Sequence, residues 1–181
     1  MCLNEMFMGK NELFIKIHRP IIKLASEIPT KGNYILMGNH PNKNDPQLVA
    51  SIAPNIIFID QGSDFNYHGL KKINSNLKLD NNCVNNLRES FLALIEGNVL
   101  CAFPEGVLNN TDELGPFLIG TMDLAIRSRT TIIPFAITGD YNIFSKNNLT
   151  IETGLPFSTC DMKKEELEKH LKNEIKILMK R

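Results

Sequence analysis

The stretch ILMGNHPNKNDPQLV, residues 35–49, passes from a strand pattern through a polar turn into a helix pattern. The apolar run at residues 33–38 is typical of a short buried strand. Asp45 is a good N-cap, and Pro46 suits the first helical position. An apolar helical face follows, made of Leu48, Val49 and Ile52. The stretch therefore predicts a strand, a tight turn and a helix in direct succession.

Strand and helix patterns continue to alternate along the chain. Apolar runs predict strands at residues 33–38, 55–60, 99–103 and 131–139. Apolar spacing and capping residues predict one helix that begins at Pro46 and others at residues 84–97, 118–128 and 163–181. This alternation predicts an α/β fold with a mixed, largely parallel sheet flanked by helices. Because no repeat or linker interrupts the pattern, we expect a single domain over residues 1–181.

Two of these segments allow finer predictions. In the helix at 84–97, Gly97 is the expected C-terminal stop, and the residues at helical spacing are Val84, Leu87, Phe91, Leu94 and Ile95. Pro134 lies inside the strand at 131–139 and has no N–H to donate. It therefore predicts a sheet edge, a bulge or a strand end at that position.

Composition excludes several classes of protein. Lys plus Arg and Asp plus Glu both number 20, so the formal net charge is zero and we expect no nucleic-acid partner. The cysteines are scattered without a CxxC pair, which argues against a metal site and favours reduced thiols in the cytoplasm. The N-terminus does not read as a secretory signal. No apolar run approaches the roughly 18 residues that a spanning helix needs.

Two strand ends carry unusual polar chemistry, Asn39-His40 and Pro104-Glu105-Gly106, and parallel strands would place both on one edge of the sheet. His40 and Asp45 have the spacing H-x4-D, so the carboxylate can orient the imidazole and stabilise the imidazolium formed when His40 takes a proton. No Ser or Cys lies in this turn, so His40 would activate a hydroxyl or water directly. The residues alone leave open a purely capping Asp45, a structural His40 and a solvated loop position for Glu105.

Several blocks of this sequence resemble the glycerolipid acyltransferase family, which includes the 1-acylglycerol-3-phosphate O-acyltransferases. NHPNKNDP, residues 39–46, is similar to the first block, N-H-x4-D, and FPEGVLNN, residues 103–110, to the third, F-P-E-G-T-R-S. TIIPFAI, residues 131–137, is similar to the fourth block, and GPFLIG, residues 115–120, stands where the family has a P-F-K-x-G segment. The order and separations fit, and the resemblance covers about residues 33–140.

The resemblance implies transfer of a fatty acyl group from acyl-CoA or acyl carrier protein to a hydroxyl of a lipid or lipid-like acceptor. His40 would be the general base and Asp45 its orienting partner. No metal or cofactor is implied beyond the acyl thioester as co-substrate. Backbone N–H groups near the helix N-terminus would stabilise the oxyanion. The residues implied to contact or shape the substrate site are Asn39, Lys43, Phe103, Pro104, Glu105, Gly106 and Pro134.

The sequence departs from the family at three positions that would bind phosphate. Leu108 replaces the arginine of the third block, and Leu118 replaces the basic residue of the P-F-K-x-G segment. The best placement of the second block, Asp80-Asn81, lacks its arginine. We therefore expect an acceptor other than lysophosphatidate, unless the missing cations are replaced by Lys43, Lys71, Lys72 or Arg88.

Two amphipathic terminal segments bear on how a lipid acceptor is reached. Residues 11–26 mix apolar and basic side chains around Pro20 and suit either a core helix or a peripheral anchor on the inner face of the membrane. Residues 162–181 are expected to pack on their own domain or on a second copy, which leaves the oligomeric state open.

Two alternative functions fit the same blocks: an acyl-thioester hydrolase and a non-catalytic acyl-chain-binding protein. Retention of His40, Asp45 and Glu105 favours the transferase over the binding protein, because the altered positions are those for acceptor recognition.

Overall fold

Strands and helices alternate along the part of the chain that the structure, a computed structural model, describes: residues 13–60, 69–74, 83–144 and 148–181. The strands are β1 (Ile21–Lys23), β2 (Tyr34–Gly38), β3 (Ile57–Asp60), β4 (Lys72–Asn74), β5 (Val99–Ala102), β6 (Thr131–Thr138), β7 (Thr150–Thr153) and β8 (Phe157–Ser158). The helices are α2 (Asp45–Ile52), α3 (Cys83–Ile95), α4 (Ile119–Arg127) and α5 (Lys164–Met179), and a helical segment spans 13–18.

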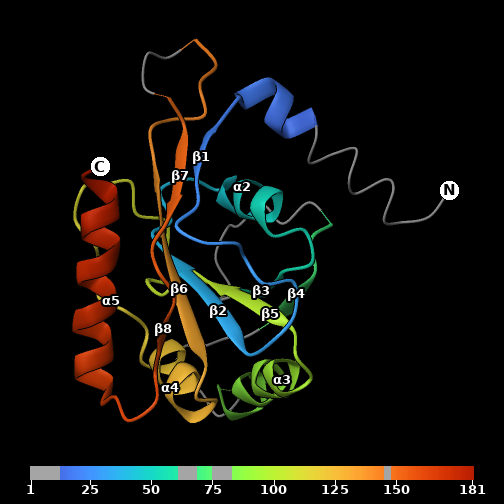
Figure 1. Ribbon diagram of the computed structural model, residues 1–181, viewed down its shortest axis with the longest axis vertical. Coiled ribbons are helices and arrows are strands. Elements are labelled where there is room, and N and C mark those ends of the chain that lie inside the picture. Colours follow the sequence, from blue (N-terminus) through green and yellow to red (C-terminus); the bar gives the residue numbers. More distant parts are fainter. Residues whose placement is uncertain (1–12, 61–68, 75–82, 145–147) are drawn as a thin grey trace, which may run out of the picture.

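All eight strands belong to one sheet in the order β1-β7-β6-β2-β5-β3-β4, with β8 also paired to β6 (Figure 1). Strand β6 pairs antiparallel with β7 and β8, whereas the other neighbours run parallel. The predicted α/β class with a mixed, largely parallel sheet is confirmed. Strands β1, β4, β7 and β8 were not predicted, because these two- to four-residue segments mix polar with apolar residues, whereas β3 and β5 lie in continuous apolar runs.

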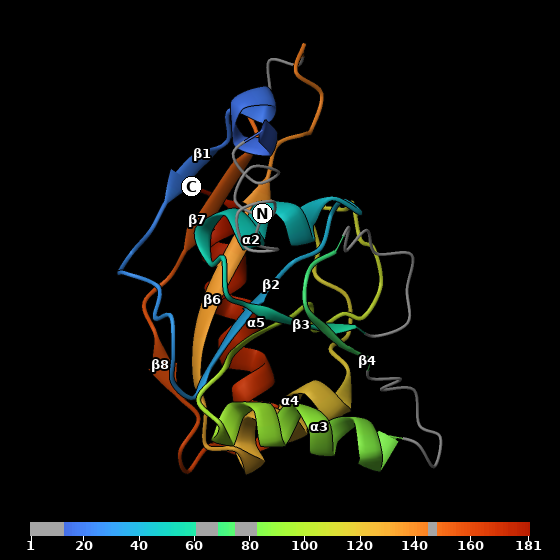
Figure 2. The ribbon, with the colours of Figure 1, turned by 90° about the vertical axis from the view of Figure 1, so that its right-hand side faces the viewer.

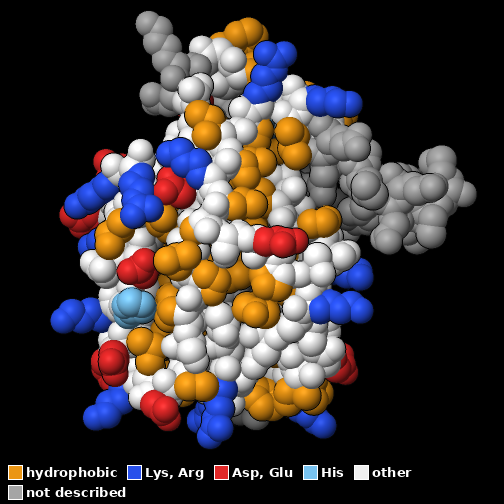
Figure 3. Space-filling view, in the orientation of Figure 1, with side chains coloured by type: hydrophobic (Ala, Val, Ile, Leu, Met, Phe, Trp, Pro, Cys, Tyr) orange, Lys and Arg blue, Asp and Glu red, His pale blue; other side chains and the backbone are white. Residues whose placement is uncertain are grey.

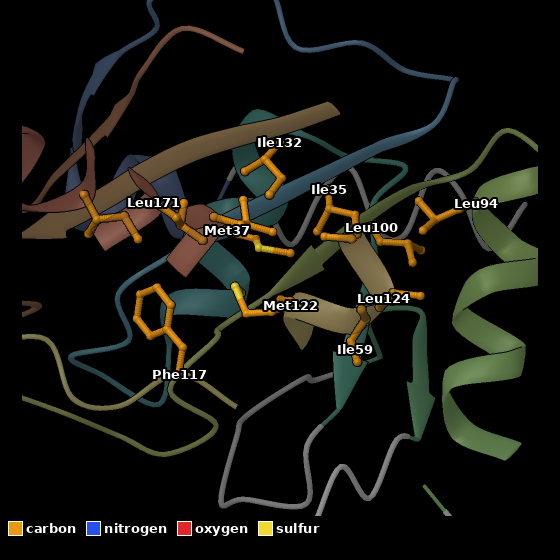
Figure 4. Close-up of a cluster of buried hydrophobic side chains, with 14 of the residues drawn as sticks. Ile35, Met37, Ile59, Leu94, Leu100, Phe117, Met122, Leu124, Ile132 and Leu171 are labelled. Atoms are coloured by element: carbon orange, nitrogen blue, oxygen red, sulfur yellow. The ribbon is translucent and has the colours of Figure 1, made fainter. Parts of the chain in front are cut away.

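Successive residues of the central strands enter two separate apolar layers, as the period of two in a strand requires. In β2, Ile35 and Met37 pack toward α3, α4 and α5, whereas Leu36 packs toward α2. Helices α2 and α5 accordingly lie on opposite faces of the sheet (Figures 1 and 2). Figure 4 shows the larger layer, to which β2 contributes Met37, α4 contributes Met122 and α5 contributes Leu171.

Helix α5 packs its apolar face on its own domain, which is one of the two expectations for residues 162–181. Leu167, Leu171 and Ile175 have no exposed surface, and Leu178 is buried beside them. These side chains lie three or four residues apart and therefore share one face of the helix.

The N-terminus of α2 differs from the prediction by one residue. Asn44 is the N-cap and makes no side-chain capping bond, while Asp45 is the first helical residue and Pro46 the second. The Asp45 carboxylate turns back toward the preceding loop instead of capping the helix.

Helix α3 also departs from its predicted face. Leu94 is buried, but Ile95 is 65% exposed, because consecutive helical residues point about 100° apart. Gly97 ends the helix as predicted, with a φ of 82° and its N–H donating to the carbonyl of Leu94.

Pro134 lies in the middle of β6, so the predictions of an edge or a strand end are wrong. On one side, Pro134 is in register with Met37 of β2. On the other side, β7 pairs with residues 135–138 and β8 with residues 131–132, so residues 154–156 face only residues 133–134. Three residues opposite two is the count of a β-bulge, which is where a strand tolerates proline.

Candidate active site

A buried histidine–carboxylate pair lies where β2 ends and α2 begins. His40 Nδ1 is 2.7 Å from Asp45 Oδ2, and neither side chain has exposed surface. The backbone N–H of Asn42 donates to the same oxygen over 2.8 Å. Because a carboxylate only accepts hydrogen bonds, the pairing places the imidazole proton on Nδ1. This tautomer makes Nε2 the basic nitrogen of the ring.

Tyr141, which the sequence reading missed, completes the bonding of Asp45. It lies three residues beyond the end of β6, and its hydroxyl donates to Asp45 Oδ1 over 2.5 Å. Burial and the neighbouring carboxylate raise the pKa of Tyr141 far above its ordinary value, so the hydroxyl stays protonated and remains a donor. The available signal was weak: a tyrosine just past the strand predicted at residues 131–139.

The Phe-Pro-Glu-Gly loop lies directly against the His40 turn. The Phe103 ring stacks on the His40 ring at 4.0 Å between centroids and 18° between planes. The backbone N–H of Asn109 donates to the carbonyl of His40 over 2.9 Å. Gly106 adopts a φ of 68°, a left-handed conformation that favours glycine. The structure thus brings together the two polar strand ends, which the sequence placed on one edge.

Glu105 is buried in this loop, at 5% exposure, so the alternative of a solvated loop carboxylate is wrong. Its Oε2 accepts hydrogen bonds from Asn109 Nδ2 over 2.6 Å and from the Gly115 N–H over 2.7 Å. A Cβ at position 115 would lie 2.9 Å from Oε2, so the close approach suits glycine. Within the described residues, the buried Oε1 has no hydrogen-bond partner. Glu105 therefore fixes the loop with one oxygen and keeps the other for a further donor.

Neither Asn39 nor Pro134 is positioned to contact a substrate. The Asn39 amide donates to the carbonyl of Ile137 over 2.8 Å and accepts from its N–H over 2.7 Å, which extends the pairing of β2 with β6. Pro134 alternates with Ile133 and Phe135, which pack in the α2 layer, and its ring lies beside Gly154 near α5. Contrary to the prediction, Pro134 therefore faces away from His40, on the other side of the sheet.

The cations considered as phosphate ligands are dispersed. Lys43 is exposed in the turn between His40 and Asp45. Lys72 pairs with Asp60 at 2.7 Å, and Lys71 is exposed beside it. Arg88 lines a separate cavity of about 460 Å³ between α3 and α4.

The two leucines at the family's cation positions, Leu108 and Leu118, are both partly exposed. Leu108 is 43% exposed just after the Phe-Pro-Glu-Gly loop, and Leu118 is half-buried at the start of α4. Asp80-Asn81, the proposed second block, lies outside the described residues.

Within the described residues, we find no group of three His, Cys, Asp or Glu side chains that could hold a metal ion. No helix in that same part of the chain is long and apolar enough to cross a membrane.

Comparison with known proteins gives consistent matches. The acyltransferase family profile matches residues 4–138. The chain is 28% identical over 96 residues to a 1-acyl-sn-glycerol-3-phosphate acyltransferase of Cocos nucifera, covering 49% of this chain and 31% of that protein. Proteins of the same name match from Borreliella burgdorferi (26% identity; 70% of this chain, 54% of the relative) and Limnanthes douglasii (24%; 88% and 63%). The matches thus span between 31% and 63% of the length of these relatives.

The fold also matches a solved structure. The crystal structure of the 1-acyl-sn-glycerophosphate (LPA) acyltransferase PlsC from Thermotoga maritima superposes with a TM-score of 0.71. The superposition covers 97% of this chain and 78% of that protein, at 17% sequence identity. At this identity the likeness establishes the shared architecture.

Proposed function

The chain belongs to the acyltransferase family, and from this premise we propose that it transfers a fatty acyl group from an acyl thioester to a hydroxyl of a lipid or lipid-like acceptor. The observation that carries the proposal is the His40–Asp45 pair, 2.7 Å apart, held against the Phe-Pro-Glu-Gly loop. The family and the site geometry support an enzyme. The acyl donor is a CoA or acyl-carrier-protein thioester, which acts as co-substrate.

In the proposed reaction, His40 Nε2 removes the proton from the acceptor hydroxyl as its oxygen attacks the thioester carbonyl. The tetrahedral intermediate carries an oxyanion, which needs hydrogen-bond donors. The donors expected at the start of α2 are already used within the turn and the first helical turn: the N–H groups of Asn42, Asn44, Asp45, Gln47 and Leu48 each donate there, and Pro46 has none. When the intermediate collapses, the carbon–sulfur bond breaks and the imidazolium returns the proton to the leaving thiolate. Asp45 stabilises the imidazolium throughout, and burial keeps this attraction strong because little water screens it.

We propose roles for the other residues of the site. Glu105 Oε1 is the proposed acceptor for a hydroxyl of the bound lipid, while its Oε2 holds the loop. Phe103 supports the face of the imidazole ring. Asn39 acts through the backbone of β6 and is assigned a positioning role. The His40 side chain has no exposed surface, so covering groups must move before a substrate reaches Nε2.

For the acceptor, we propose a lipid alcohol without a terminal phosphate monoester. Leu108 and Leu118 stand where the family pattern has cations, and Lys72 is already paired with Asp60. Losing a charge-assisted bond to phosphate weakens binding by roughly 1.5–3 kcal/mol, and two such losses make a poor phosphate site. The name shared by the curated relatives favours the competing acceptor, 1-acyl-sn-glycerol 3-phosphate.

One end of the molecule is the proposed contact with the inner face of the membrane. Leu13 is 57% exposed and Ile17 48% on the helical segment 13–18, and Ile143 and Phe144 are 58% and 88% exposed on the loop after β6. Ile17 and Ile143 line the same cavity as Arg19, so the two segments adjoin. Figure 3 shows apolar and basic side chains together at this end. Such a surface suits the interface of an anionic bilayer.

Purified protein should be incubated with labelled long-chain acyl-CoA and, in parallel, with acyl carrier protein thioester, each with lysophosphatidate, monoacylglycerol or total lipid extract. Acylated lipid supports the transferase, free fatty acid alone indicates the hydrolase, and bound but unconsumed donor indicates the binding protein. His40→Ala is expected to abolish turnover. If lysophosphatidate were acylated at the same rate as monoacylglycerol, the proposed acceptor would be wrong.

The acceptor proposal also has a matched pair of variants. Leu108→Arg restores the cation of the family pattern and is expected to raise turnover of lysophosphatidate, whereas Val107→Arg places the same charge on the neighbouring exposed residue. Equal effects of the two changes would contradict a specific role for position 108.

Membrane contact is tested by flotation with vesicles of neutral and anionic phospholipid. Phe144→Ser is expected to weaken binding to anionic vesicles, and Leu155→Ser, at a similarly exposed apolar position, is the control. Unchanged binding of Phe144→Ser would contradict the proposed contact surface.

A further inference from the structure

Tyr141 fixes the one carboxylate oxygen of Asp45 that does not face His40. Oδ2 receives hydrogen bonds from His40 Nδ1 and the N–H of Asn42, while Oδ1 receives the Tyr141 hydroxyl over 2.5 Å. With donors on both oxygens, the carboxylate group resists rotation about its Cβ–Cγ bond. Rotation would break the 2.7 Å contact that sets the imidazole tautomer.

The Tyr141 ring is packed against other rings, and its loop is constrained. The ring meets the helical segment 13–18: the His18 ring lies edge-on at 5.6 Å and the Phe14 ring at 6.1 Å, and these two rings contact each other at 4.6 Å. The loop that carries the ring is constrained at Gly139, two residues earlier, where φ is 81° and a Cβ would lie 2.1 Å from the carbonyl oxygen of Asn148. The hydroxyl is therefore directed at Asp45 by a packed ring on a constrained loop.

We propose that Tyr141 is a positioning residue of the acyl-transfer reaction: its hydroxyl holds the Asp45 carboxylate in the orientation that aligns His40, and the helical segment 13–18 holds its ring. The inference rests on the proposed function, because it assigns Tyr141 to the same catalytic pair. Tyr141 does not touch the reacting atoms and acts only through Asp45.

Tyr141→Phe removes the hydroxyl and keeps the packed ring. If the transition state loses one hydrogen bond to a charged group, kcat is expected to fall by about tenfold or more. The KM for the acyl thioester is expected to stay within about twofold, because Tyr141 does not contact the donor. The matched control is Tyr34→Phe, which removes a hydroxyl at the start of β2, the opposite end of that strand from His40. It is expected to leave both constants unchanged.

A second readout follows the His40 Nδ1–H proton by NMR and needs no turnover. Removing the Tyr141 hydroxyl lets the carboxylate rotate away from Nδ1, which weakens the hydrogen bond from Nδ1 and moves its proton resonance upfield. Tyr34→Phe is expected to leave the resonance in place. A general loss of stability would lower the folded fraction of Tyr141→Phe without moving the resonance of the molecules that remain folded.

The outcomes separate the two proposals. A tenfold fall in kcat with a shifted Nδ1–H resonance supports the positioning role. A resonance that shifts in a protein with no acyl transfer to any acceptor supports the role of Tyr141 in holding the pair and overturns the proposed function. Wild-type kcat in Tyr141→Phe, or an unshifted resonance, overturns the positioning role while leaving the transferase in place.

Discussion

Replacing Asp45 with asparagine isolates the charge of the catalytic pair from its shape. Asparagine can keep its amide oxygen toward His40 Nδ1 and the Asn42 N–H, and turn its NH2 toward the Tyr141 hydroxyl oxygen, which can accept. The contacts to His40 and Asn42 thus survive, the bond with Tyr141 reverses its direction, and the negative charge beside the imidazolium is lost. The unfolding free energy is expected to fall by only about 1–3 kcal/mol, as one set of charge-assisted bonds weakens.

The effect on catalysis follows from the geometry. His40 Nδ1 and Asp45 Oδ2 are 2.7 Å apart and fully buried, which puts the centres of the two charges about 4 Å apart. At an effective dielectric constant of about 20, their attraction is about 4 kcal/mol. Losing it from the transition state lowers kcat by about 1,000-fold. Steady-state acylation of monoacylglycerol measures kcat, and urea denaturation measures the unfolding free energy of the same samples.

Asp123→Asn is the matched control, because Asp123 forms a half-exposed ion pair with Lys164, 2.7 Å away, on α4 and α5. It is expected to change stability by less than about 1 kcal/mol and kcat not at all. If Asp45 stabilises the imidazolium by its charge, Asp45→Asn must lower kcat by about 1,000-fold. A kcat within about threefold of wild type would show that Asp45 does not act in this way. A loss of folding rather than of kcat would show that the carboxylate is mainly structural.

Three further predictions concern stability and are checked by urea denaturation. Asn39→Ala leaves the buried N–H and carbonyl of Ile137 without their partners and should lower the unfolding free energy by about 2–5 kcal/mol; a value below about 1 kcal/mol would contradict this role. Leu171→Ala should cost about 2–5 kcal/mol, whereas Ile177→Ala on the exposed side of α5 should cost about 0.5 kcal/mol or less; equal costs would contradict the packing of α5. Burial raises the pKa of the Cys101 thiol above its ordinary 9.0, so it stays protonated in the folded chain while the unfolded thiol ionises. The contribution of Cys101 to the unfolding free energy should therefore be complete below that pH and be lost as the pH rises past it. In Cys101→Ala, the decrease of the unfolding free energy between about pH 8 and about pH 10 should be smaller than in wild type. An identical decrease in the two proteins would contradict this account.

Local sequence was sufficient wherever the deciding contacts lie within a few residues. The His40–Asp45 pairing spans one turn, and the Asn42 N–H bonds to Asp45 within that same turn. Gly106 adopts its left-handed conformation within the Phe-Pro-Glu-Gly loop. The apolar spacing of α5 likewise predicted its buried face, because a helical period fixes which residues share a side. The same reasoning failed at Asp45 by one residue, since the carboxylate bonds backward to the turn and leaves the helix uncapped.

The tertiary structure decided what depends on distant parts of the chain. The Tyr141 hydroxyl meets an Asp45 oxygen 96 residues away, and the Asn39 amide meets Ile137 across 98 residues. Pro134 was mistaken for part of the site because its side of the sheet depends on register, and a shift of one residue reverses the face. Sequence thus determined the turns that carry the reactive groups, since those rest on local hydrogen bonding. Only the pairing of the strands determined which side chains surround them, because that pairing is set by burial across the whole sheet.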